Sequence, residues 1–149
     1  MATRSSHPIL SYTDGFAEGM SDTVLLVGRV LIASMFFLTA WFGSPNVGYL
    51  TFLGFSSAAI WSPIAITVEF IIIISLVLGI GTRYGALLGL LFVIVATVIA
   101  HRYWGYPQAQ QLVQYTFLTK NLAIAGGLLL LFVTGAGSYS IDKMLTGKR

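Results

Sequence analysis

The sequence predicts an all-α membrane protein, an antiparallel bundle of four transmembrane helices with an apolar interfacial segment between the first two. Of the 149 residues, 56% are hydrophobic and only 9% are charged, whereas a soluble domain carries about 25% charged residues. The apolar residues also form several runs near the length of about 20 residues that a helix needs to cross a bilayer. At this chain length we expect one compact bundle without a separate soluble domain.

The residue types that are missing limit the chemistry. The chain has no cysteine and two histidines, one of which, His7, lies in a polar tail. Disulfides, iron–sulfur clusters and thiolate zinc sites are therefore excluded, and we expect no cofactor held covalently or through metal ligands. The chain has a net charge of +3 but no cluster of basic residues, so nucleic acid is not an expected partner.

The N-terminal segment, residues 1–21, is polar and lacks the features of a cleavable signal peptide. Asp14, Glu18 and Asp22 recur at every fourth position. This spacing permits a short amphipathic helix that leads into the membrane. A solvated tail is the alternative.

The first predicted span covers residues 24–43, with Ser21 or Asp22 as its cap. Arg29 lies about one and a half turns inside this span. Because a long basic side chain can extend along apolar surface to the headgroups, we expect Arg29 to snorkel or to form a structural ion pair. We favour both over a role in ligand binding.

Residues 44–62 are too interrupted by proline, glycine and serine to span the membrane. The segment is uncharged and aromatic, which is typical of the boundary between membrane and water. It could cover the bundle as a lid, or dock another subunit. The candidate partner surface consists of Tyr49, Phe52, Phe55 and Trp61.

Three further spans follow. The second covers residues 63–80, with Pro63 at the first helical position, where the fixed φ of proline is favourable. A short polar turn then allows only an antiparallel neighbour, residues 84–101. The fourth span covers residues 115–135.

The basic residues predict the orientation. Six lie on the side of the termini, whereas Arg102 and Lys120 lie on the other side. The six are Arg4, Arg29, Arg83, Lys143, Lys148 and Arg149. Because positive charge favours the cytoplasmic side, we expect both termini in the cytoplasm and the bundle in the cell inner membrane. The membrane domain covers residues 22–142, and a basic tail, residues 143–149, follows it.

A carboxylate, Glu69, lies inside the second span. An ionisable group in lipid is costly and marks a candidate functional site. Glu69 is six residues from the start of its span, roughly 9 Å deep at 1.5 Å per residue. The third span ends on the same side with His101, and Lys120 enters there at a comparable depth. We therefore predict a Glu69–His101–Lys120 cluster, with Arg102 and Asn121 as its neighbours.

This cluster has two interpretations. An internal ion pair would lock the bundle, because opposite charges lower the cost of burying each other. Alternatively, the cluster forms a pocket for a lipid-soluble molecule with a polar head, such as a quinone. His101 or Lys120 would then donate to a carbonyl of the head, and Glu69 would relay protons. Bound lipid is also expected.

Several stretches of the chain resemble a known family. They are Arg29, residues 68–70, residues 78–83, His101 and residues 117–123, 126–130 and 135–142. These stretches resemble the DoxX family of small four-helix bacterial and archaeal membrane proteins. Some members resemble the membrane subunit of thiosulfate:quinone oxidoreductase or accompany terminal oxidases. The resemblance implies a four-helix fold and a respiratory or redox association.

Three functions follow from these observations. The first is an accessory subunit of a respiratory or other redox membrane complex, which stabilises or docks partner subunits. The second is a quinone-binding membrane subunit of a thiosulfate:quinone-type oxidoreductase. The third and least favoured is a small-solute carrier, because the polar groups crowd one leaflet. We expect no catalysis by the chain alone; a catalytic role would be that of a quinone-linked oxidoreductase subunit.

Overall fold

The structure is a computed structural model that describes residues 8–43 and 45–147, with side chains described from residue 17 onward. These residues form helices and no strand. The elements are α1 (Pro8–Phe42), α2 (Val47–Phe52), α3 (Ala58–Leu78), α4 (Thr82–Ala100), the 3-10 turn η1 (Tyr103–Gly105), α5 (Gln108–Thr134) and α6 (Ile141–Thr146). In the described part of the chain, α1, α3, α4 and α5 are long and apolar enough to cross a membrane. The predicted bundle of four membrane helices is therefore confirmed.

The helices begin earlier than the predicted spans. α3 begins at Ala58, so Pro63 lies inside the helix instead of at its first position. α5 begins at Gln108, seven residues before the predicted start at Tyr115. The reason is that hydropathy marks only the lipid-crossing part, whereas the backbone hydrogen bonds of a helix continue into the polar flanks. The predicted N-terminal helix is also continuous with the first span in α1.

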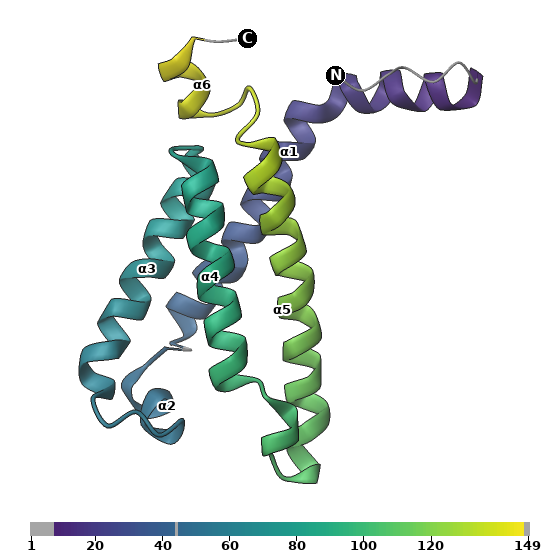
Figure 1. The fold of residues 1–149 in the computed structure, drawn as a ribbon. Helices are drawn as coiled ribbons and strands as arrows, with labels where there is room; N and C mark the ends of the chain where they lie inside the picture. Colours follow the sequence, from purple (N-terminus) through teal and green to yellow (C-terminus); the bar gives the residue numbers. More distant parts are fainter. Residues whose placement is uncertain (1–7, 44, 148–149) are drawn as a thin grey trace.

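The four long helices run antiparallel, and both ends of the chain lie at the same end of the bundle (Figure 1). The first turns of α1, drawn in purple, bend away from the bundle axis (Figure 1). α1 packs mainly on α3, and α5 packs mainly on α4. The buried core where the helices meet consists of Ala33, Phe36, Ile72, Leu76, Ala86, Val93, Leu128 and Leu131.

Glycines allow α3 and α4 to approach closely. The turn between them contains Gly79 and Gly81, with φ values of 67° and 56°, a region that favours glycine. A Cβ atom added to Gly85 would collide with the side chain of Ser75 on α3. One added to Gly89 would lie 3.3–3.4 Å from side chains of α1, α3 and α5. Small residues thus bring the helix backbones together, as is usual in membrane bundles.

The expectation that Arg29 snorkels to the headgroups is wrong. Its side chain is fully buried, and Nη2 donates a hydrogen bond to the carbonyl oxygen of Tyr139. The chain after α5 folds back over this end of the bundle and supplies the acceptor. Of the other basic residues used to predict the orientation, Arg4, Lys148 and Arg149 lie outside the described residues.

Candidate functional site

The end of the bundle that holds the termini is closed by the segment from Gly135 to Gly147, which we call the C-terminal clasp. Hydrogen bonds between charged side chains and backbone groups join the clasp to the rest of the bundle. Asp142 accepts hydrogen bonds from the N–H groups of Gly81 at 2.7 Å and Thr82 at 2.9 Å. Asp22 accepts one from the N–H of Ser138 at 2.7 Å. The protein itself therefore satisfies these charges.

The charge of Asp142 is favoured by these contacts. Burial acts to raise the pKa of its carboxyl group, but the backbone hydrogen bonds from Thr82 and Gly81 outweigh this effect and hold the pKa below its ordinary value. The nearby charge of Arg29 acts in the same direction. Asp142 therefore stays ionised and fastens the clasp to the turn between α3 and α4.

The opposite end of the bundle contains a half-enclosed cavity of about 690 Å³. Its volume falls within the range of about 300–1,000 Å³ that is common for small-molecule sites. All four membrane helices and the segment between α1 and α3 contribute to its walls, which are mostly aliphatic and aromatic. The polar side chains among the lining residues are Thr39, Tyr49, Glu69, His101, Lys120 and Asn121.

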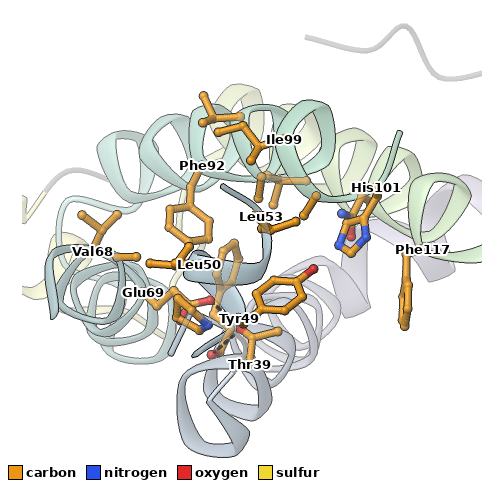
Figure 2. Close-up of a pocket in the computed structure, with 18 of the residues that line it drawn as sticks. Thr39, Tyr49, Leu50, Leu53, Val68, Glu69, Phe92, Ile99, His101 and Phe117 are labelled. Atoms are coloured by element: carbon orange, nitrogen blue, oxygen red, sulfur yellow. Dashed lines mark hydrogen bonds between the residues drawn. The ribbon is translucent and has the colours of Figure 1, made fainter. Parts of the chain in front are cut away.

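The segment between α1 and α3 covers this cavity. Tyr49, Leu50 and Leu53 line the cavity, and in the close-up they lie between the side of Glu69 and the side of His101 (Figure 2). Asn46 starts α2 as its N-cap, because Oδ1 accepts a hydrogen bond from the N–H of Tyr49 at 2.8 Å. Of the two roles expected for this segment, a lid or a docking surface, its position fits a lid.

The four aromatic residues of the candidate partner surface do not form one exposed surface. Tyr49, Phe55 and Trp61 line the cavity, although half of Trp61 remains exposed. Phe52 is 69% exposed and lies at a neighbouring depression. Only Phe52 faces mainly outward.

Glu69 is the buried acid of the cavity. It lies on α3 and is 2% exposed. Oε1 accepts a hydrogen bond of 2.5 Å from the hydroxyl of Thr39 on α1. Within residues 8–43 and 45–147, no group hydrogen-bonds to Oε2. A buried acceptor without a donor costs about 1–3 kcal/mol, so the protein alone leaves Glu69 incompletely satisfied.

The other polar side chains gather around α4 and α5. His101 Nδ1 is hydrogen-bonded to Gln114 Oε1 at 2.8 Å, and its ring lies 5.0 Å from the ring of Phe117. The Lys120 ammonium lies 4.9 Å from the centre of the Phe117 ring. Asn121 donates to Thr97 Oγ1 at 2.9 Å. Phe117 thus contacts both His101 and Lys120.

The cavity brings four of the five predicted residues together, but not as one ion-paired cluster. Glu69 and His101 lie on opposite sides of the cavity (Figure 2). Arg102 is exposed and lines the neighbouring depression with Tyr106 and Gln110. Counting residues gives the depth of a side chain along a helix, but not its direction around the helix, which is why the predicted pairing differs from the structure.

Sequence reasoning missed Thr39 and Gln114. Thr39 had a usable signal, because it is a polar residue near the end of the first span and therefore at a depth similar to that of Glu69. Gln114 lies just before the predicted fourth span and had no such signal. Its hydrogen bond to His101 forms because the chain reverses direction through η1. The sequence does not predict how close this reversal brings the two side chains.

α1 and α5 border the cavity from different sides. They approach each other at Gly127, where an added Cβ atom would lie 3.2 Å from Cδ1 of Ile32. From there they diverge toward the cavity end (Figure 1). Lining residues come from both helices beyond this point, including Thr39 and Lys120.

Comparison with known proteins assigns the chain. The model of the SURF4 family matches residues 12–146, nearly the whole sequence. The chain belongs to the SURF4 family. The resemblance to the DoxX family is therefore wrong, and the respiratory and redox associations that it implied lose their basis.

The chain is similar to proteins of bacteria and yeast. The Escherichia coli inner membrane protein YphA is 32% identical over 130 residues, which cover 80% of this chain and 89% of YphA. The inner membrane protein YqjF of the same organism is 30% identical over 133 residues, or 87% of this chain and 97% of YqjF. The yeast ER-derived vesicles protein ERV29 is 28% identical over 121 residues. No solved structure matches.

These relatives agree with the structure on one point. Two of them are named inner membrane proteins, and four helices of this chain are suited to cross a bilayer. This member of the SURF4 family is an integral membrane protein. The match covers 80% of this chain but only 33% of ERV29.

Proposed function

We propose that the protein binds a small lipid-soluble molecule with a polar group in the cavity opposite the termini. The observation that carries this proposal is a cavity of about 690 Å³ with apolar walls and a buried carboxylate among its lining residues. Apolar pockets with a few convergent polar groups are the usual form of small-molecule sites. A carboxylate at membrane depth is costly unless it has a partner or a role.

The position of the cavity suits a ligand that arrives from the bilayer. α1 and α5 diverge beyond Gly127 (Figure 1), and residues of both helices line the half-enclosed cavity. The mostly apolar walls suit a molecule that is dissolved in the membrane. We therefore favour a lipid-soluble ligand over a water-soluble one, and binding over a continuous solute pathway.

Filling the cavity tests this proposal. Ala96 lines the cavity on α4, whereas Val98 on the same helix is 65% exposed and does not line it. Wild type, Ala96→Phe and Val98→Phe are purified in mild detergent, and native mass spectrometry measures small molecules that remain bound. We expect bound ligand in wild type and Val98→Phe and its loss in Ala96→Phe. Equal occupancy of all three proteins would contradict the proposal.

A quinone is one molecule of the proposed class. Its carbonyl oxygens would accept hydrogen bonds from the Lys120 ammonium, which makes no hydrogen bond within the described residues. Adding ubiquinone to the same three proteins tests this case. Binding of ubiquinone that Ala96→Phe abolishes would support it, whereas retention of lipid but not ubiquinone would exclude it.

Docking of partner subunits is a second candidate, favoured by the exposed aromatic ring of Phe52 on α2. We expect Phe52→Ser to reduce crosslinking to co-purified polypeptides while cavity binding is unchanged. Unchanged crosslinking would exclude this surface. The experiment therefore separates docking from ligand binding.

We also infer that the termini face the cytoplasm of a cell with an inner membrane, as the distribution of basic residues favours. Both ends lie at one end of the bundle (Figure 1), so reporter fusions to either end should give the same result. We expect a C-terminal alkaline phosphatase fusion to be inactive and a green fluorescent protein fusion to fluoresce. The opposite pattern would reverse the orientation.

A further inference from the structure

The unsatisfied oxygen of Glu69 limits the chemistry of the ligand. We propose that the cavity takes a lipophilic molecule that carries a hydroxyl group or a protonated amine, and that this group donates a hydrogen bond to Oε2 of Glu69. The inference rests on the proposed function, because it names the class of ligand that the cavity would bind. It begins from the hydrogen bonds around Thr39.

Thr39 cannot satisfy the carboxylate by itself. A threonine hydroxyl has one proton to donate, and Thr39 Oγ1 lies within hydrogen-bond distance of three acceptors. These are Glu69 Oε1 at 2.5 Å, the carbonyl of Phe36 at 2.9 Å and the carbonyl of Met35 at 3.2 Å. One proton shared among three acceptors leaves nothing for Oε2, which has no partner in the described part of the chain.

The other polar side chains of the cavity have contacts of their own. Asn121 donates to Thr97, and His101 is hydrogen-bonded to Gln114. Lys120 lies over the ring of Phe117. His101 is on the opposite side of the cavity from Glu69 (Figure 2). Neither these side chains nor that of Tyr49 hydrogen-bonds to Oε2 in the described part of the chain, so a donor on a molecule in the cavity would complete the hydrogen bonding of Glu69.

The site is built to accept such a donor. Glu69 lines the cavity, and the terminal torsion of a glutamate is broad and roughly two-fold. Oε2 is buried in the structure, and a rotation of the carboxylate about this torsion would present it to the cavity. The surrounding walls are apolar, so the donor must sit on an apolar body. Long-chain alcohols, amines and hydroquinones have this chemistry, whereas alkanes, ethers and oxidised quinones without a hydroxyl group do not.

Competition between two matched molecules tests the inference. The full chain in lipid nanodiscs is labelled with a diazirine derivative of hexadecanol, and mass spectrometry of the peptides locates and quantifies the label. Unlabelled hexadecanol and its methyl ether then compete for the site. They differ by one donor and one methyl group, and a hydrogen bond to a charged group is worth about a tenfold difference in affinity. We expect hexadecanol to compete about ten times better than the ether.

Two variants assign this preference to one side chain. In Glu69→Leu we expect the alcohol and the ether to compete equally. Lys120→Met removes the other charged side chain of the cavity, and we expect it to keep the preference for the alcohol. A preference that persists in Glu69→Leu would overturn the role of Glu69.

The outcomes separate this inference from the proposed function. Labelled cavity peptides with equal competition by alcohol and ether in wild type would overturn the donor requirement but leave the cavity as a binding site. Absence of label from peptides that line the cavity would overturn both. The wild-type comparison needs no variant, so it decides the inference even if Glu69→Leu does not fold.

Discussion

The two ends of the bundle treat buried charge differently. At the end with the termini, both oxygens of Asp142 accept hydrogen bonds from backbone N–H groups of the α3–α4 turn. Arg29 donates through Nη2 to the clasp, although its Nε and Nη1 have no partner among the described residues. At the other end, Glu69 has one shared hydroxyl and an oxygen without a partner among the described residues. The opposite charges of Arg29 and Asp142 also interact with each other and hold the fold, whereas an acid with an unsatisfied oxygen beside a cavity is suited to recognise a ligand. The same costly side chains thus have two roles.

The largest expected effect is on stability at the closed end. Arg29→Met removes the donor to the Tyr139 carbonyl and the positive charge near Asp142. Removing one member of a buried charged network is strongly destabilising, and we expect a loss of about 3 kcal/mol in the free energy of unfolding. Chemical denaturation in detergent micelles measures it. A loss no greater than that of a surface substitution would contradict the structural role of Arg29.

The next effect concerns Asp142 and is smaller. Asp142→Asn retains one acceptor for the two backbone N–H groups of Gly81 and Thr82, so we expect a loss of about 1 kcal/mol. Because the folded-state pKa of Asp142 is lowered, its stabilisation is present above the ordinary pKa of about 3.9. It is lost as the pH falls through the lower folded-state value.

Unfolding measured across this acidic range tests the sign of the effect. The difference in stability between wild type and Asp142→Asn should shrink as the pH falls. A difference that grows with acidity would show that the carboxylate is not the stabilising form. Met144→Gln, at an 81% exposed position of the same helix, provides a control.

The smallest effect on stability is expected at the cavity end. Thr39→Val removes the hydroxyl that binds Glu69 and keeps the size of the side chain. Since the carboxylate is already incompletely satisfied, we expect less than about 1 kcal/mol of destabilisation. We also expect this substitution to change the affinity for hexadecanol by a larger factor than it changes stability, because both oxygens of Glu69 then lack a protein donor. A change in stability as large as that of Arg29→Met would contradict this contrast.

The sequence predicted the parts of this architecture that hydropathy and residue counting can reach. The four spans, the tight turn before Arg83 and the position of Glu69 and Lys120 at the same end of the bundle follow from the length of apolar runs and the rise of a helix. The acceptor of Arg29 could not be found this way, because every residue has a carbonyl group and only tertiary folding brings that of Tyr139 to it.

The cavity was predictable only in part. Polar residues in apolar runs located Glu69, Lys120 and His101, since each is costly in lipid. The return of α2 over the cavity and the pairing of Glu69 with Thr39 depend on the directions of helices around their axes. The DoxX resemblance misled the functional prediction, because features such as a glycine-rich turn and an early arginine are compatible with more than one family of small membrane bundles.

Thermal unfolding with and without hexadecanol tests the contrast between the two ends most directly. A ligand at about a hundred times its Kd stabilises the folded state by about 2.7 kcal/mol. Asp142→Asn should unfold at a lower temperature than wild type but show the same rise with hexadecanol. Glu69→Leu should unfold near wild type and show about half the rise, because tenfold weaker binding at the same concentration stabilises by about 1.4 kcal/mol. The contradicting result would be a Glu69→Leu protein that is strongly destabilised and shows the full rise of wild type.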